Sequence, residues 1–184
     1  DHGYNDQEEL IPTNINFYFP QGSSYLSQYL ATDGKSNKAK KSNLSAFIAD
    51  KNITRTVTIT GTHSPEGSET INGDLSKNRA EAIEKYYRSQ MSKYDYTGTA
   101  ADIKFILKPV VQDWKAFKVA LRSSEISEDS KKAFLNIVNG SGSFEDKEKA
   151  MRKIPAYKSV FNKVYPSLRT AQTEILTVKE KKSP

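Results

Sequence analysis

The sequence contains no cysteine, and its only histidines are His2 and His63. Disulfides, thiol catalysis and cysteine-based metal sites are therefore excluded. Two imidazoles make a zinc site unexpected, and any serine–histidine–aspartate triad would have to be built on His63. We accordingly expect neither a metal ion nor a cofactor.

Long apolar runs are also missing. No run approaches the roughly 18 apolar residues that a membrane-spanning helix needs, so we expect no such segment in this chain. The sequence begins at Asp1, without a methionine or a signal peptide. Any signal or membrane anchor is therefore expected upstream.

Charge of one sign is in modest excess. The 28 lysines and arginines outnumber the 22 aspartates and glutamates, which gives a net charge of +6. The lysines are scattered, and no arginine-rich run alternates with aromatic residues, so no nucleic-acid partner is expected. Attraction to an anionic polymer or to an anionic membrane surface stays open.

The length of 184 residues suits one domain. Residues 1–13 are polar and are expected to form an N-terminal tether, followed by a single domain over residues 14–184. Alternating apolar positions predict strands, and apolar positions three and four apart predict helices. The predicted order is strand 14–19, helix 36–52, strand 53–60, helix 75–91, strand 102–110, a long helical region and a closing strand 173–179. This pattern favours an α/β (α+β) two-layer sandwich with a βαβαβ core.

The stretch GTHSPEGSETINGDLSKNRA, residues 61–80, separates the clearest strand from a helix. Pro65, Gly67 and Gly73 predict a long polar loop, and Ser76 suits the N-cap of the following helix. Loops that lead into a helix N-terminus commonly hold ligands.

Residues 61–80 resemble the signature of OmpA-like C-terminal domains, the peptidoglycan-binding modules of Gram-negative envelope proteins. That signature reads roughly GxTDxxGxxxxNxxLSxxRA. The resemblance covers about residues 14–107 and, more weakly, residues 165–178, whereas residues 109–156 form an enlarged helical insertion that compact members lack. The matching positions are Gly61, Gly67, Asn72, Leu75, Ser76, Arg79 and Ala80.

The resemblance implies a noncatalytic periplasmic module that tethers the outer membrane, or an assembly anchored there, to the cell wall. The family's ligand is the diaminopimelate of the peptidoglycan stem peptide, whose α-centre carries a carboxylate and an ammonium. By position, Arg79 is the carboxylate ligand, helped by amides at the start of the helix. Asn72 is expected to shape the pocket, and Leu75 and Ser76 belong to the predicted ligand-binding set.

One position departs from the family. The aspartate that pairs with the ligand, fifteen residues before the arginine, is replaced by Ser64. Losing its charge-assisted contact costs about 1–2 kcal/mol. Glu66 is the predicted replacement, so that Ser64 and Glu66 face the ammonium. A site altered for another ligand is the alternative.

Two other functions stay open. A protein-interaction module that has lost wall binding would use residues 109–156 to contact another envelope or surface-fibre protein. An enzyme would depend on His63 and on the carboxylates Glu66 and Glu69. His63 has no evident nucleophile partner and no second histidine nearby, so we expect no catalytic residue and no metal ligand.

Overall fold

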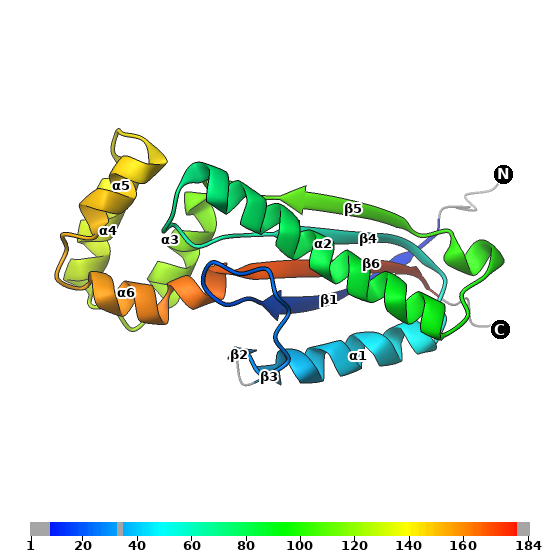
Figure 1. Cartoon of the computed structure of the whole chain (residues 1–184). Coiled ribbons are helices and arrows are strands. Elements are labelled where there is room, and N and C mark those ends of the chain that lie inside the picture. The colour runs from blue at the N-terminus through cyan, green and yellow to red at the C-terminus, as the bar shows by residue number, and fades with distance from the viewer. Residues whose placement is uncertain (1–7, 33–34, 180–184) are drawn as a thin grey trace, which may run out of the picture.

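The computed structural model describes residues 8–32 and 35–179. Figure 1 shows an elongated molecule with a sheet and two long helices at one end and a group of short helices at the other. The elements are β1 (Leu10–Tyr18), β2 (Ala31–Thr32), β3 (Lys35–Ser36), α1 (Asn37–Ala49), β4 (Thr54–Gly61), α2 (Glu69–Lys93), η1 (Gly98–Ala101), β5 (Lys104–Pro109), α3 (Trp114–Ser123), α4 (Glu128–Asn139), α5 (Phe144–Met151), α6 (Tyr157–Lys163), η2 (Tyr165–Leu168) and β6 (Thr170–Val178).

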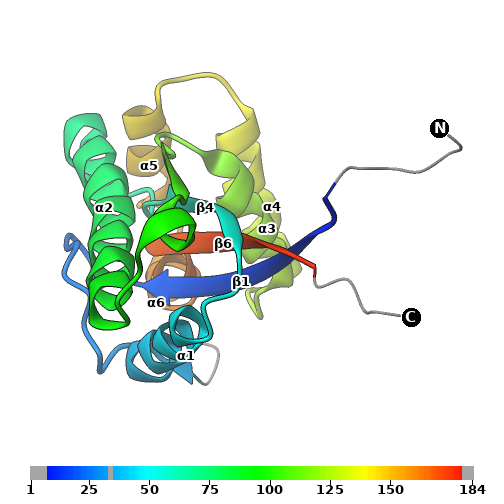
Figure 2. The ribbon, with the colours of Figure 1, turned by 90° about the vertical axis from the view of Figure 1, so that its right-hand side faces the viewer.

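The sheet is mixed and four-stranded, in the order β1-β6-β4-β5. β6 runs antiparallel to both of its neighbours, whereas β4 and β5 are parallel and are joined by the crossover helix α2. Figure 2 shows α1 and α2 on the same side of the sheet. The predicted two-layer sandwich of helices on a sheet is therefore confirmed.

The main core lies between the sheet and these two helices. β4 and β6 bury alternate residues because successive side chains of a strand point to opposite faces. In β4, Val57 and Ile59 are fully buried against the helices, and Thr56, Thr58 and Thr60 alternate with them on the other face. The core is completed by Phe17, Phe19, Leu44, Ile48, Ala80, Ile83, Tyr87, Met91, Ala171 and Ile175.

The start of β4 differs from the prediction. Ile53 continues the alternation of Val57 and Ile59 in the sequence, yet it precedes the strand and is 58% exposed. The pairing of β4 with β6 shifts register between Thr54 and Thr56, so the alternation does not extend back to Ile53.

The start of α2 also differs from the prediction, and this correction changes the site. The helix begins at Glu69 and not near Ser76, because Ser68 is the N-cap and accepts a hydrogen bond from the Ile71 amide at 3.3 Å. Asn72 and Gly73, which suggested a loop, therefore lie inside the helix. The loop between β4 and α2 shrinks to residues 62–68, called the signature loop below.

The N-terminal tether is shorter than predicted. Leu10–Thr13 belongs to β1, where it pairs with the last residues of β6 from Ile175 to Val178. Residues 8–9 precede the strand, and residues 1–7 of the predicted tether lie outside the described residues.

The helices from α3 to η2, residues 114–168, pack around a second hydrophobic core and are called the helical unit below. This unit extends beyond the predicted insertion of 109–156, because residues of α6 and η2 are part of the same core. It lies at the end of the sheet where β4 and β5 end and β6 begins (Figure 1). Its fully or nearly fully buried members are Phe117, Leu121, Ile126, Phe134, Val138, Met151, Val160, Val164, Tyr165 and Leu168.

Candidate functional site

The signature loop sits where β4 and α2 come closest. A Cβ atom placed on Gly61 would lie 1.8 Å from the carbonyl oxygen of Ser76 and 3.3 Å from the amide nitrogen of Ala80. Only glycine allows this approach. The contact holds the middle of α2 against the end of β4, which brings Arg79 under the loop.

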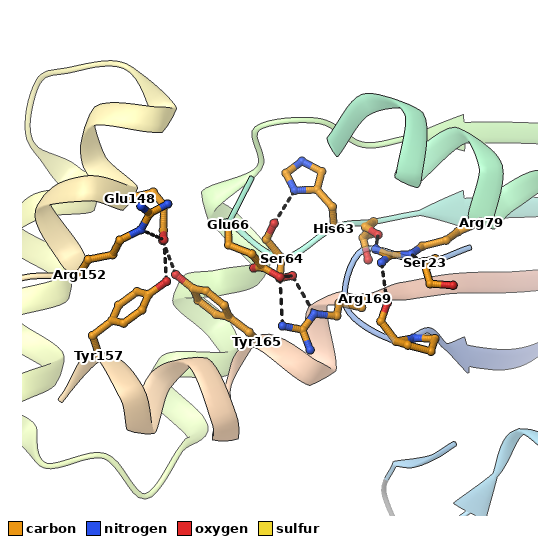
Figure 3. Close-up of polar contacts among 12 residues, drawn as sticks. Ser23, His63, Ser64, Glu66, Arg79, Glu148, Arg152, Tyr157, Tyr165 and Arg169 are labelled. Atoms are coloured by element: carbon orange, nitrogen blue, oxygen red, sulfur yellow. Dashed lines mark hydrogen bonds and ion pairs between the residues drawn. The ribbon is translucent and has the colours of Figure 1, made fainter. Parts of the chain in front are cut away.

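Arg79 is 1% exposed and binds three backbone carbonyls (Figure 3). Its Nε donates to Ser23 O at 3.0 Å, its Nη1 to Thr62 O at 2.7 Å and its Nη2 to Pro20 O at 3.2 Å. Within the described residues no carboxylate is hydrogen-bonded to it. Burial, and then the like charge of Arg169, lower the pKa of Arg79 to about 10.

The predicted surroundings of Arg79 need correction. The side chain leaves α2 well past the first turn, where helix amides bind carbonyls of the preceding turn and are not free for a ligand. The amides of the first helical turn lie near Ser68 instead. One of them, the Glu69 amide, donates to Glu145 Oε1 of α5 at 3.0 Å.

Ser64 and Glu66 lie together, and Arg169 joins them (Figure 3). Arg169 Nε donates to Ser64 Oγ at 2.9 Å, and its Nη2 donates to Glu66 Oε1 at 3.0 Å. Ser64 Oγ in turn donates to Glu66 Oε1 at 2.7 Å. Arg169 is 7% exposed, so the ion pair is largely removed from water.

Sequence reasoning missed Arg169. It follows η2 directly and precedes β6, and it lies 105 residues from Ser64. No spacing rule connects two positions so far apart. The only signal available was a single arginine ahead of the predicted closing strand.

Two buried polar atoms beside the signature loop have no hydrogen-bond partner among the described residues, an acceptor at Glu66 Oε2 and a donor at Asn72 Nδ2. Asn72 is 1% exposed, and its side chain packs against Gly67, whose φ is +98°. Buried polar groups are nearly always bonded, so each of these two atoms is suited to bind a water or a ligand atom.

The last two predicted site residues have other surroundings. Ser76 is buried, and its Oγ donates to Val110 O at 2.7 Å, which ties α2 to the segment after β5. Leu75 is half-buried one position earlier in the helix. Ser76 thus positions the helix, and its hydroxyl already donates its hydrogen bond to Val110 O.

His63 uses both ring nitrogens inside the protein. The amide of Gln112 donates to Nε2 at 3.0 Å, so the proton resides on Nδ1, which donates to Ser64 O at 2.8 Å. Desolvation by burial lowers the pKa of His63, so the ring is neutral near pH 7. The ring also meets the edge of Phe144, at 5.8 Å between centroids, which ties the loop to the helical unit.

We expect the free energy of unfolding to fall as the pH drops from about 7 to about 5. Because the folded-state pKa of His63 lies below 6.5, the unfolded chain takes up a proton first. The contribution of neutral His63 to the free energy of unfolding is complete above the pKa that His63 has in the unfolded chain. It is lost as the pH falls towards the folded-state pKa, by at most about 1.4 kcal/mol per pH unit. Urea unfolding at several pH values measures the slope. His63→Gln should flatten it, and equal slopes would contradict the neutral assignment.

A surface pocket of about 270 Å³ opens between the signature loop and α5. It reaches Gly67, against which the Asn72 side chain packs. The pocket is lined by Gly67, Ser68, Glu145, Glu148, Lys149 and Arg152.

Within residues 8–32 and 35–179, no group of three or more histidine or acidic side chains could hold a metal ion. No helix there combines the length and the apolar composition that crossing a bilayer requires.

No family model matches the chain, and no curated protein matches it either. Among solved structures, the chain is similar to the OmpA-like domain of FopA1 from Francisella tularensis subsp. tularensis SCHU S4. The two are 14% identical, with a TM-score of 0.44 over 99% of this chain and 90% of that one. That domain carries the name of the family that residues 61–80 resemble.

Proposed function

We propose that this chain is a noncovalent peptidoglycan-binding module that works in the periplasm. It would bind the diaminopimelate stem peptide and so tether the outer membrane, or an assembly anchored there, to the cell wall. The observation that carries the proposal is Arg79, a buried cation in the signature-bearing region whose hydrogen bonds reach only backbone carbonyls.

A buried charge without an ionic partner is costly, so proteins normally pair it. A ligand carboxylate would supply the missing negative charge. Arg79 uses three of its five N–H donors, which leaves one on each terminal nitrogen, the number that a bidentate carboxylate accepts. The carbonyls of Pro20 and Ser23 belong to the chain segment after β1, and this segment would shift to admit the ligand.

Arg79→Lys tests this role because lysine keeps the charge and loses the planar fork. We expect binding to purified sacculi, and to a soluble diaminopimelate stem peptide, to weaken at least about tenfold, which corresponds to about 1.4 kcal/mol. Arg88→Lys is the matched control, since Arg88 lies on the same helix and its side chain is 57% exposed. Equal binding by Arg79→Lys and wild type would rule out the mechanism, provided that circular dichroism shows both folded.

A second candidate is a protein-interaction module that has lost wall binding, with the helical unit as the contact surface. It is favoured by an open pocket of about 340 Å³ lined in part by Ala116, Val119, Ala120 and Leu168. Val119 is 58% exposed, so this pocket presents an apolar side chain to solvent. Co-purification of a defined envelope protein, together with no retention on sacculi, would support this candidate over the first.

We propose no catalytic role. His63 is the residue on which an enzyme would depend, and its two nitrogens are engaged by backbone groups. Incubation with purified peptidoglycan should release no soluble fragments.

A further inference from the structure

The helical unit and the rest of the molecule have separate hydrophobic cores. Among the described residues, no side chain belongs to both cores. The unit lies between β5 and β6 in the sequence, so two chain connections join it to the sheet. Bodies joined in this way move against each other unless a large apolar interface holds them together. The contacts between the unit and the signature loop therefore decide how firmly the unit is held.

His63 lies at the centre of these contacts. It is 8% exposed, and it meets the unit at two places. Its ring meets the edge of Phe144, the first residue of α5, at 5.8 Å between centroids. Its Nε2 accepts a hydrogen bond at 3.0 Å from the amide of Gln112, which belongs to the connection between β5 and α3.

The Gln112 amide belongs to a strained turn. Its φ is +57°, a left-handed conformation that residues other than glycine rarely adopt unless their surroundings hold them there. The next residue, Asp113, caps α3 and accepts a hydrogen bond from the Lys115 amide at 2.8 Å. His63 Nε2 thus holds the turn from which the helical unit departs.

This hydrogen bond requires a neutral imidazole. Once Nε2 carries a proton, it cannot accept from the Gln112 amide, and two N–H donors face each other. The turn then loses the contact that holds its positive φ. Protonation also places a charge on a buried ring, which is costly until the ring reaches water.

The charged groups that face the ring are Arg79 of α2, Glu66 of the signature loop and Asp113 ahead of α3. Arg79 opposes a charge on the ring, whereas the two carboxylates favour it. Glu66 is already paired with Arg169, and Asp113 is exposed to water. The neighbour on α5, Phe144, is uncharged. Burial therefore prevails, and the ring is neutral while the unit is in place.

We propose that His63 is an acid-operated latch: the neutral ring holds the helical unit against the signature loop, and the protonated ring releases the unit while both cores stay folded. Release separates α5 from the signature loop and so opens the pocket between them. The ratio of closed to open molecules falls by at most about tenfold for each pH unit below 6.5. The inference goes beyond the proposed function and needs no ligand.

Energy transfer between two dyes measures the release. The chain has no cysteine, so the dyes attach only at introduced ones, Lys85→Cys on α2 and Lys132→Cys on α4, both exposed positions. Lowering the pH from 7.5 to 5 should raise the fraction of molecules with a second transfer efficiency at least about fivefold. Circular dichroism should stay unchanged. In His63→Gln, whose neutral amide oxygen can accept from the Gln112 amide, this fraction should not depend on pH.

Glu145→Gln is the matched control, because Glu145 is a titratable side chain of α5 that binds the Glu69 amide of α2. This variant should respond to pH as wild type does, and a lost response would contradict the latch. A wild type without a pH response, or the same response in His63→Gln, would overturn the inference. Loss of circular dichroism along with the change in transfer would also overturn it, because the cores would then have unfolded.

Should His63→Gln not fold, the wild type still decides the question. The midpoint of the change in energy transfer must coincide with the midpoint of the His63 ring titration followed by NMR. Two different midpoints would show that another group drives the release.

Discussion

Replacing Gly61 with alanine should lower the free energy of unfolding by about 3 kcal/mol. The new Cβ would lie 1.8 Å from Ser76 O and 2.8 Å from Ser76 C, and both atoms belong to the helix backbone. A side chain could rotate away, but a helix cannot, so α2 must move off β4. That movement separates Val57 and Ile59 from the helix face that covers them. Urea unfolding followed by circular dichroism measures the loss.

Gly73→Ala is the matched control. Gly73 lies inside α2, and a Cβ there would meet only the Val111 Cγ2 methyl at 3.8 Å, an ordinary contact. Since glycine costs a helix interior about 1 kcal/mol relative to alanine, this variant should be more stable than wild type. If the two alanine variants lost similar stability, the close approach of α2 to β4 would not explain why residue 61 is a glycine.

The effect should also reach the site, because the Gly61 contact sets the distance between the signature loop and Arg79. The Arg79 guanidinium spans from α2 to Thr62 O, one residue after Gly61. A helix displaced from β4 would lengthen this hydrogen bond. We therefore expect Gly61→Ala to weaken stem-peptide binding as well as stability.

Replacing Glu148 with alanine should cost the helical unit about 4 kcal/mol. Its carboxylate is buried and accepts hydrogen bonds from Tyr157 OH at 2.6 Å, Tyr165 OH at 2.5 Å and Arg152 Nε at 3.0 Å (Figure 3). Burial first, and then the Glu148 charge, raise the pKa of Tyr165 far above its ordinary value, so its hydroxyl stays a donor. Without the carboxylate, two tyrosine hydroxyls lose their partner.

Fluorescence of Trp114, the single tryptophan, reports this unfolding because its ring stacks on Phe144 and meets Phe117 inside the helical unit. Glu81→Ala is the control, since its pair with Lys77 is exposed and should contribute less than about 1 kcal/mol. An effect of Glu148→Ala as small as that of Glu81→Ala would show that the tyrosine hydroxyls find other partners.

The periodic patterns in the sequence were sufficient for the layers of the fold. Val57 and Ile59 alternate with threonines, Leu44 and Ile48 recur at helical spacing, and all four are fully buried where the patterns place them. Ser127 stands ahead of Glu128 and Asp129, a pattern typical of a helix start, and it caps α4. These features are local, because side-chain alternation and helix capping depend on neighbours a few residues away.

The start of α2 was misjudged for a local reason as well. Gly67 and Gly73 both looked like turn residues, but only Gly67 adopts a positive φ, and Gly73 is helical. Intrinsic propensity does not distinguish these two glycines. The helix extends through Gly73 because Ser68 caps it, and because Ser76 is held against Gly61 and bonded to Val110.

By itself, the sequence determined the sandwich and the presence of a polar loop between β4 and α2, since these follow from short-range spacing. Only the tertiary structure decided what those residues do. Arg79 is buried under carbonyls of the segment after β1, and Glu66 is neutralised by Arg169 from the far end of the chain. The charge of a site depends on every group within a few ångströms, and packing brings such groups together from positions that no sequence period connects.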